Sequence, residues 1–305
     1  MKTGPLWCVT VTTNPEAEEA VSEFLQDCFS RPTASFVDAD SGATTVSVYF
    51  SRRPAGWRAA VREGLARVQG GALNTGPGKI SVRKIHGRDW ANSWKRHFHP
   101  LEVGVSLLVK PSWSRRRARA GQAEVVLDPG LSFGTGQHPT TLFCLRQLVA
   151  TRSTSTPQSV LDLGTGSGIL CIAAVKLGYT PVHGFDFDPV AIRIARANTR
   201  RNGVLRRVQL QVADVRRLPL RCAVPYDVVC ANLSADVLTS ECARIAARVK
   251  SSGILVLAGI LRKEFRQVAR TYASAGFKLV ASQTEKEWQG GAFVRSPARA
   301  AGRPG

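Results

Sequence analysis

The fold is decided by residues 160–168, VLDLGTGSG, in which an apolar run leads into three glycines separated by single residues. The apolar run predicts a buried strand, and the glycines predict a tight turn at which the backbone comes close to a ligand. A helix is predicted over residues 169–177, where Gly178 closes it. Strand, glycine turn and helix in this order are typical of the carboxyl edge of a parallel α/β sheet, where nucleotides bind.

The alternation of strand and helix continues along the chain, and this is the signature of a parallel sheet. A second helix is predicted over residues 189–201, ending near Gly203. We therefore expect a doubly wound, Rossmann-like α/β domain. The other predicted strands are residues 181–185, 208–212, 227–230 and 254–257, with 278–282 and 292–295 as a final antiparallel pair.

A separate N-terminal domain is predicted over residues 1–85. Strand-like runs there alternate with two amphipathic helical stripes, and the first helix begins at Asn14 and Pro15. Asn14 can cap the free amides of a helix, and proline suits the first helical position. The order strand, helix, strand, strand, helix, strand predicts a small α+β domain of the ferredoxin-like type, a fold that often binds other macromolecules.

Three further segments complete the predicted organisation. Residues 86–100 are expected to form a linker helix, whose tryptophans either pack the two domains together or face a substrate. Residues 101–295 form the α/β domain, with additional strands at 103–110 and 123–127. The Pro-, Arg- and Gly-rich residues 296–305 are expected to be a disordered tail.

Composition bounds the function less tightly. The net charge is +20, and 32 of the 42 basic residues are arginines. This excess indicates either basic side chains spread over solvated faces or attraction to a polyanion such as ribosomal RNA. The run Arg115–Arg119 is expected to be a solvated hairpin tip or a phosphate-contacting loop.

The expected location is cytoplasmic. The chain begins with a strand-like run instead of a secretory signal, and it has no apolar stretch long enough for a membrane helix. Its seven cysteines are irregularly spaced and include no CxxC pair, so neither a disulfide framework nor a zinc site is expected. The predicted partners include no membrane, and no metal site is predicted.

Two cofactors compete for the glycine turn. A dinucleotide site needs GxGxxG, whereas here the spacing is GxGxG and Asp162 stands two residues before Gly164. A carboxylate at that place repels a pyrophosphate but suits a sulfonium and an amino group. With Gly164 and Gly166 close to the ligand and Asp186 taking the ribose hydroxyls, the pattern favours S-adenosyl-L-methionine over a nicotinamide dinucleotide.

Two more predicted strand ends carry polar side chains. Asp214 either accepts a hydrogen bond from the adenine amino group or caps a helix. Asn232 either orients a substrate amine through its carbonyl oxygen or forms a turn. Upstream, the glycine-rich residues 128–141 enter a helix near Thr140 and are placed to fold over the cofactor, with Phe133 and Gly134 as candidate contacts.

The sequence resembles the PrmA family, methyltransferases of large-subunit ribosomal protein eleven. The resemblance covers residues 80–295 well and the preceding residues in layout, and it implies a class I methyltransferase fold. Two departures are Thr165, where cysteine is frequent, and the strong basicity. The matching runs are RDWANSWKRHFHP (88–100), DPGLSFGTGQHPTT (128–141), LDLGTGSGIL (161–170), GFDFDP (184–189), DVVCANL (227–233), LVLAGIL (255–261) and EKEW (285–288).

The resemblance implies an enzyme that trimethylates lysine side chains and an N-terminal amine of that ribosomal protein, which the N-terminal domain captures. By matching motif positions, Thr141, Gly164, Asp186 and Asn232 bind the cofactor. The attacking amine must be neutral, which for a lysine at pH 7 costs about 4–5 kcal/mol. We expect Asn232 to hold this amine as the catalytic residue while solvent takes the proton, with His138 as a candidate base.

Three other functions stay open from the sequence. The first is methylation of lysines in a different protein. The second is methylation of ribosomal RNA or another nucleic acid, although enzymes that act on base amines usually carry Asn-Pro-Pro and an aromatic residue, and here Leu233 and Ser234 follow Asn232. The third is a non-enzymatic ribosome-binding protein, against which the intact glycines and acids argue.

Overall fold

The computed structural model describes residues 6–31, 33–37, 43–70, 74–85, 99–128 and 138–296. The chain divides into two compact units, Met1–His97 and Phe98–Gly305, and the division falls within the predicted linker helix. Most of that linker and the tail after Ser296 lie outside the described residues.

The N-terminal unit has the predicted order of strands and helices, which is the order of ferredoxin-like domains. Its four strands form one antiparallel sheet in the order β2-β3-β1-β4. Asn14 caps the short helical turn before α1, where its Oδ1 accepts a hydrogen bond from the Ala17 amide (3.3 Å). The elements are β1 (Leu6–Thr13), α1 (Glu18–Phe29), β2 (Thr33–Val37), β3 (Thr44–Phe50), α2 (Trp57–Gly70) and β4 (Lys79–Ile85).

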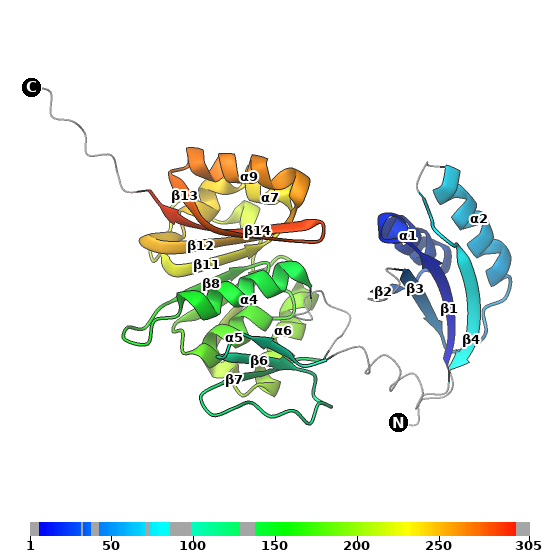
Figure 1. Ribbon diagram of the computed structural model, residues 1–305, viewed down its shortest axis with the longest axis horizontal. Coiled ribbons are helices and arrows are strands. Elements are labelled where there is room, and N and C mark those ends of the chain that lie inside the picture. The colour runs from blue at the N-terminus through cyan, green and yellow to red at the C-terminus, as the bar shows by residue number, and fades with distance from the viewer. Residues whose placement is uncertain are drawn as a thin grey trace, which may run out of the picture. The chain divides into compact units, whose positions relative to one another are not determined.

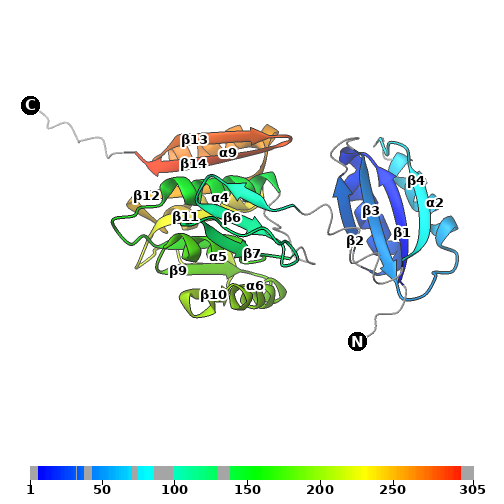
Figure 2. The same cartoon turned by 60° about the horizontal axis from the view of Figure 1, so that its bottom comes forward.

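Both helices of this unit cover the same face of its sheet. Alternate residues of β1 and β3, such as Val9 and Val48, are fully buried in one cluster with Val21 of α1 and Val61 of α2. Figure 2 shows the four strands side by side with the two helices behind them. The unit therefore has an apolar core of its own.

The C-terminal unit is built on a seven-stranded sheet in the order β10-β9-β8-β11-β12-β14-β13. The first five strands in this order are parallel, and β14 runs antiparallel to both β12 and β13, as predicted. The strands are β8 (Val160–Leu163), β9 (Val182–Asp186), β10 (Val208–Val212), β11 (Tyr226–Asn232), β12 (Val249–Leu261), β13 (Phe277–Glu285) and β14 (Trp288–Arg295).

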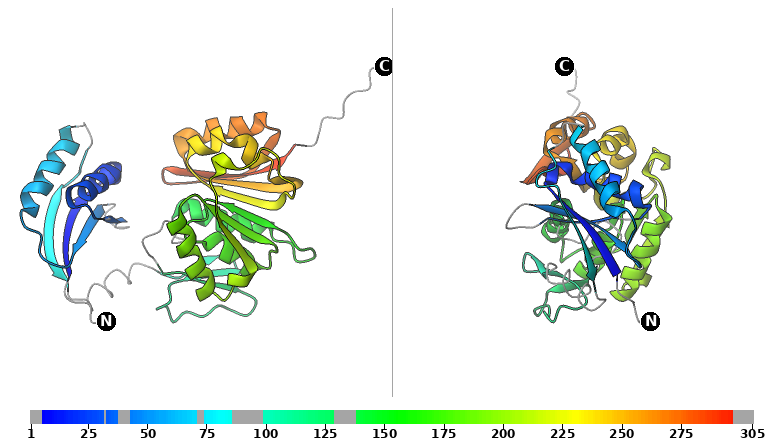
Figure 3. Two further views of the ribbon diagram at one scale, coloured as in Figure 1. Left: turned by 180° about the vertical axis from the view of Figure 1, so that it is seen from behind. Right: turned by 90° about the vertical axis from the view of Figure 1, so that its right-hand side faces the viewer.

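Helices lie on both faces of this sheet, so the fold is doubly wound as expected (Figures 1 and 3). One apolar cluster packs α4, α5 and α6 on one face, and a second packs α7, α8 and α9 on the other. The helices are α4 (Pro139–Thr151), α5 (Ile169–Leu177), α6 (Pro189–Arg201), α7 (Ala235–Ser240), α8 (Cys242–Ala246) and α9 (Arg262–Ser274), with short turns η3 (Leu205–Arg207) and η4 (Val215–Arg217).

A small third sheet, β5-β6-β7, corrects two expectations. The single strand predicted over 103–110 is two antiparallel strands, β5 (Leu101–Val103) and β6 (Leu107–Lys110), because the chain turns at Gly104, whose φ is +56°. The predicted hairpin is also wrong, because β6 and β7 (Ala123–Val126) are parallel and residues 111–122 cross back between them.

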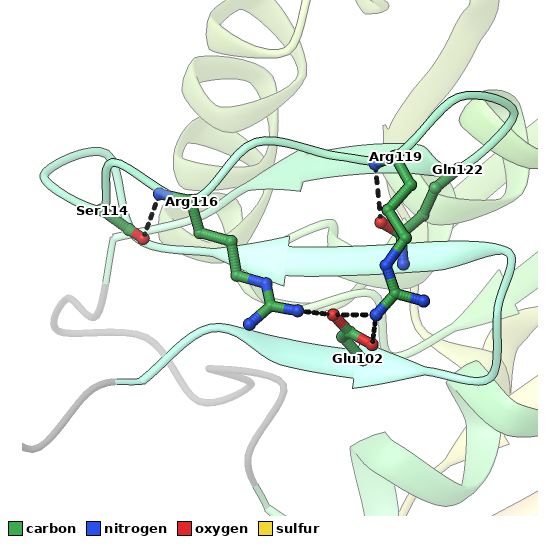
Figure 4. A network of polar contacts seen from close by, with 5 residues as sticks. All are labelled: Glu102, Ser114, Arg116, Arg119 and Gln122. Atoms are coloured by element: carbon green, nitrogen blue, oxygen red, sulfur yellow. Dashed lines mark hydrogen bonds and ion pairs between the residues drawn. The ribbon is translucent and has the colours of Figure 1, made fainter.

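The arginines of this crossover are partly neutralised. Arg116 and Arg119 both contact the carboxylate of Glu102 on β5 (Figure 4). Arg119 is held further by a hydrogen bond from its amide to Gln122 Oε1 (3.1 Å). The crossover is therefore fastened to its own sheet.

All seven cysteines are free thiols, and five of them are buried. Burial raises the pKa of Cys144, Cys171 and Cys230, so these thiols stay protonated at neutral pH. Within the described residues, no helix has the length and apolar character needed to cross a bilayer.

Candidate cofactor and substrate site

The glycine turn after β8 is tied to the end of the neighbouring strand β9. The amides of Gly164 and Thr165 both donate to the Phe185 carbonyl (2.9 and 2.8 Å), and the Gly166 amide donates to Asp186 Oδ2 (2.8 Å). Gly164 and Gly166 have φ values of +76° and +51°, a conformation that glycine adopts without a steric penalty. The turn therefore presents bare backbone at the carboxyl edge of the sheet.

Asp186 lies at this edge as predicted and is also a structural acceptor. Its Oδ1 accepts a hydrogen bond from the Asp188 amide (3.0 Å), so each carboxylate oxygen already has one backbone partner. Each oxygen keeps a second lone pair for a ribose hydroxyl. Beside it, the Phe187 side chain is 74% exposed and Val190 is 46% exposed. This exposed apolar surface beside a carboxylate suits the purine ring of a nucleoside whose ribose binds the carboxylate, and the sequence analysis did not identify it.

Asp162 lies beneath the turn, fully buried. Its Oδ2 accepts a hydrogen bond from Thr165 Oγ1 (2.7 Å), whereas its Oδ1 has no partner among the described residues. Burial, assisted by the nearby charge of Asp186, raises the pKa of Asp162 to about 7. A bound cation would favour the ionised form of this carboxyl group.

The start of α4 supplies a second buried group without a partner. The Thr141 side chain is 2% exposed, and within the described residues its Oγ1 makes no hydrogen bond. His138 caps this helix, and its Nδ1 lies 2.7 Å from Thr140 Oγ1. Burial lowers the pKa of His138, so its ring is neutral at pH 7. Phe133 and Gly134, the other predicted contacts, lie outside the described residues.

Asp214 follows β10 and is the N-cap of η4. Its Oδ1 accepts a hydrogen bond from the Arg216 amide (2.9 Å). The capping role that the sequence left open is therefore present. Asp214 Oδ2 has no hydrogen bond to the described residues, so it remains available to a ligand.

Asn232 ends β11 at the same edge. Its amide side chain is half-buried and makes no hydrogen bond within the described part of the chain. The next residue, Leu233, donates its amide to the Ala258 carbonyl of β12 (3.1 Å). The Leu233 side chain also packs against the glycine turn: a Cβ placed on Gly164 would lie only 2.5 Å from Leu233 Cδ2.

The structure thus brings Gly164, Gly166, Asp186, Asp214 and Asn232 to one edge of the sheet. At this site, Thr141 Oγ1 and Asp162 Oδ1 are buried and have no partner among the described residues, so they fit a ligand that supplies hydrogen-bond donors and positive charge. S-adenosyl-L-methionine carries both, in its amino and sulfonium groups. A dinucleotide would instead place a pyrophosphate near the buried carboxyl group.

This edge places the chain among the Rossmann-like methyltransferases that use S-adenosyl-L-methionine. Residues 5–295 match the family described as Ribosomal protein L11 methyltransferase (PrmA). The ribosomal protein L11 methyltransferase of Streptococcus mutans is 31% identical over 95% of this chain and 96% of its own length. That of Geobacter sulfurreducens is 41% identical over 68% of this chain and 67% of its own.

A solved structure supports the same family. The ribosomal protein L11 methylase of Lactobacillus delbrueckii subsp. bulgaricus superimposes with a TM-score of 0.57 at 26% identity, covering 66% of this chain and 99% of that chain. The chain belongs to the ribosomal protein L11 methyltransferase (PrmA) family.

Proposed function

We propose that this protein transfers methyl groups from S-adenosyl-L-methionine to lysine side-chain and N-terminal amines of ribosomal protein L11. The observation that carries the proposal is the hydrogen bond between the Gly166 amide and Asp186, because it joins the glycine turn to the carboxylate that we expect to bind the ribose. The family match supports the substrate. Because ribosomal proteins are made in the cytoplasm, we expect the reaction to occur there.

The bound cofactor supplies an electrophilic methyl group. Gly164 and Gly166 would contact it through their backbone, Asp186 would accept hydrogen bonds from the ribose hydroxyls, and Asp214 Oδ2 would accept one from the adenine amino group. Thr141 Oγ1 and Asp162 Oδ1, which have no partner among the described residues, would bind the amino acid part of the cofactor. Positioning supplies much of the rate in such an in-line displacement.

Asn232 acts on the substrate amine. Its amide oxygen, which has no partner among the described residues, would accept a hydrogen bond from the amine and so orient the nitrogen lone pair for attack. The amine must first lose a proton, and transfer from water into a closed site lowers its pKa. Solvent takes this proton in our proposal; His138 is neutral but already contacts Thr140.

The N-terminal unit is the proposed capture domain for the substrate protein. It has its own core and contributes none of the predicted cofactor contacts. Catalysis and substrate selection therefore belong to separate units of the chain. The enzyme lacking residues 1–97 should keep cofactor binding and lose transfer to the ribosomal protein.

Intact-mass analysis of purified L11 incubated with enzyme and S-adenosyl-L-methionine tests the proposal. We expect steps of one methyl mass on lysines or the N-terminus, and about 100-fold slower transfer by Asn232→Ala, because misplacing a reacting group costs about that factor. Asn202→Ala, whose side chain bonds Val126 and no predicted site residue, is the control. Unmodified L11 with intact cofactor binding would point to another protein or to RNA, and full turnover by Asn232→Ala would refute its role.

We also propose that a basic surface of the C-terminal unit contacts ribosomal RNA. Residues 189–213 hold six arginines and no acidic residue. Arg193, Arg200 and Arg206 are exposed and have no acidic partner among the described residues. We call these three, of which two lie on α6 and Arg206 lies on the following turn η3, the α6 arginines. They are better placed for phosphate than Arg116 and Arg119, which Glu102 already holds.

Two of these three arginines lie away from the catalytic edge. Arg206 lies in η3, directly before the amino end of β10, whereas Asp214 follows the carboxyl end of that strand. Arg200 is in the last turn of α6, whose first turn follows Asp186. RNA bound near Arg200 and Arg206 would therefore leave the cofactor and the substrate amine accessible at the opposite edge.

A further inference from the structure

Strand β12 carries a bulge beside Asn232. Its pairing with β14 shifts between Leu257 and Ile260, so that β12 has one extra residue there. Gly259, within this bulge, has a φ of +80°. Bulges commonly re-aim side chains next to active sites, and the left-handed conformation favours glycine.

Gly259 faces the substrate-binding residue directly. A Cβ placed on it would lie 2.6 Å from the Leu233 carbonyl oxygen and 3.0 Å from Asn232 Oδ1. The first obstacle is backbone, and the Leu233 amide is itself bonded to Ala258 beside the bulge. A larger residue at position 259 would therefore displace Asn232 and Leu233.

A second glycine confines the same segment from the cofactor side. Leu233 Cδ2 occupies the space that a side chain at Gly164 would need. Residues Asn232 and Leu233 therefore lie between two glycines, with the Leu233 side chain against Gly164 and the Asn232 amide oxygen against Gly259.

We propose that Gly259 is a positioning residue for methyl transfer, because its bare α-carbon lets the Asn232 amide and the Leu233 carbonyl close against β12. The inference rests on the proposed role of Asn232. Gly259 touches neither substrate nor cofactor in this account; it acts through Asn232. Its effect should therefore appear in turnover and depend on the presence of the Asn232 side chain.

The test compares Gly259→Ala with Gly276→Ala in the full-length enzyme. Gly276 has a φ of +85° and open space around its missing Cβ, so it carries the same backbone strain without the contact. We expect kcat for L11 to fall about 10- to 100-fold in Gly259→Ala and to stay within twofold of the original in Gly276→Ala. Equal kcat values in the two variants would overturn the proposal.

A double-mutant cycle separates positioning from a general loss of structure. In the Asn232→Ala background, Gly259→Ala should slow transfer by less than twofold, because the amide that it displaces is already gone. The same fold loss in both backgrounds would contradict the inference. An inactive original enzyme would instead refute the proposed function.

Should Gly259→Ala fail to fold, Leu233→Ala provides the second test. It removes the side chain that fills the space beside Gly164, and unlike Gly259→Ala it places no side chain on a backbone with positive φ. We expect a lower kcat, again without a further effect in the Asn232→Ala background. Unchanged kcat in Leu233→Ala would show that packing does not place the amide.

Discussion

Asp162 is a carboxyl group that the folded chain encloses without a full set of partners. Its pKa rises from an ordinary value of 3.8 to about 7, so between these pH values the folded state keeps a proton that the unfolded chain has lost. The contribution of this residue to stability is therefore undiminished below about pH 4 and falls as the pH rises through 7.

Asp162→Asn should remove this pH dependence. At pH 8 we expect the free energy of unfolding of the ligand-free variant to exceed that of the original protein by up to several kcal/mol. This difference should shrink toward pH 4. Urea titrations across this pH range measure it. Cofactor affinity should fall in the variant, because an asparagine at this position cannot supply the negative charge that attracts a cationic ligand. Parallel pH profiles for the two proteins would contradict the assignment.

The sequence singled out Asp162, Asp186 and Asn232 because the first lies within a recognisable apolar strand and the other two end such strands, and their roles in binding stay predictions. It did not predict the partners of these side chains. Gly259 in particular is separated from Asn232 by two helices in the chain and meets it only through the pairing of β11 with β12. Contacts of this kind depend on strand register, which local sequence patterns do not encode.

At the scale of elements, helix α6 supports the glycine turn. Asn198 Nδ2 donates to the Ser167 carbonyl (2.8 Å), and this bond links the helix to the turn after β8. Asn198→Ala should weaken cofactor affinity by about 2- to 10-fold, the worth of one hydrogen bond. Calorimetric titration with S-adenosyl-L-methionine measures the change.

One helical turn away, Asn202 provides the matched control. Its side chain bonds the amide and the carbonyl of Val126 and the main-chain carbonyl of Asn198, so it fastens the small third sheet to α6 and makes no bond to the glycine turn. Asn202→Ala should lower stability by about 1–3 kcal/mol and leave cofactor affinity unchanged. Equal affinity losses in the two variants would mean that α6 acts only as a scaffold.

The central strands β8 and β11 were predictable because parallel strands that are buried on both faces give continuous apolar runs. The small sheet β5-β6-β7 was harder to predict. The alternation over residues 103–110 continues through the turn at Gly104, and nothing local distinguishes a parallel β6-β7 crossover from a hairpin. Only the packing of β7 against α5 in the apolar cluster resolves that choice.

For the whole molecule, the question to test is which of its basic side chains bind RNA. Replacing the α6 arginines by glutamine should weaken binding of a fluorescent single-stranded RNA at least 10-fold at low salt. The slope of log affinity against log salt should fall by about 2, near 0.7 for each lost phosphate contact. Fluorescence polarisation over a salt series measures both.

A variant with the same change in charge controls for net attraction. Lys263, Arg266 and Arg270 on α9 are exposed and likewise have no acidic partner among the described residues. Their replacement by glutamine should weaken RNA binding less than threefold. Equal losses would mean that the charge acts as a diffuse field, and tighter binding of duplex DNA or of anionic vesicles would contradict the choice of RNA.

The distribution of the thiols has a practical consequence. Cys28 is exposed in the N-terminal unit and Cys222 is partly exposed in the C-terminal unit, whereas the other five are buried. Maleimide dyes should therefore react first with one site on each unit, without engineered cysteines. Resonance energy transfer between the two dyes would then report, in real time, whether the units approach each other when the substrate protein arrives.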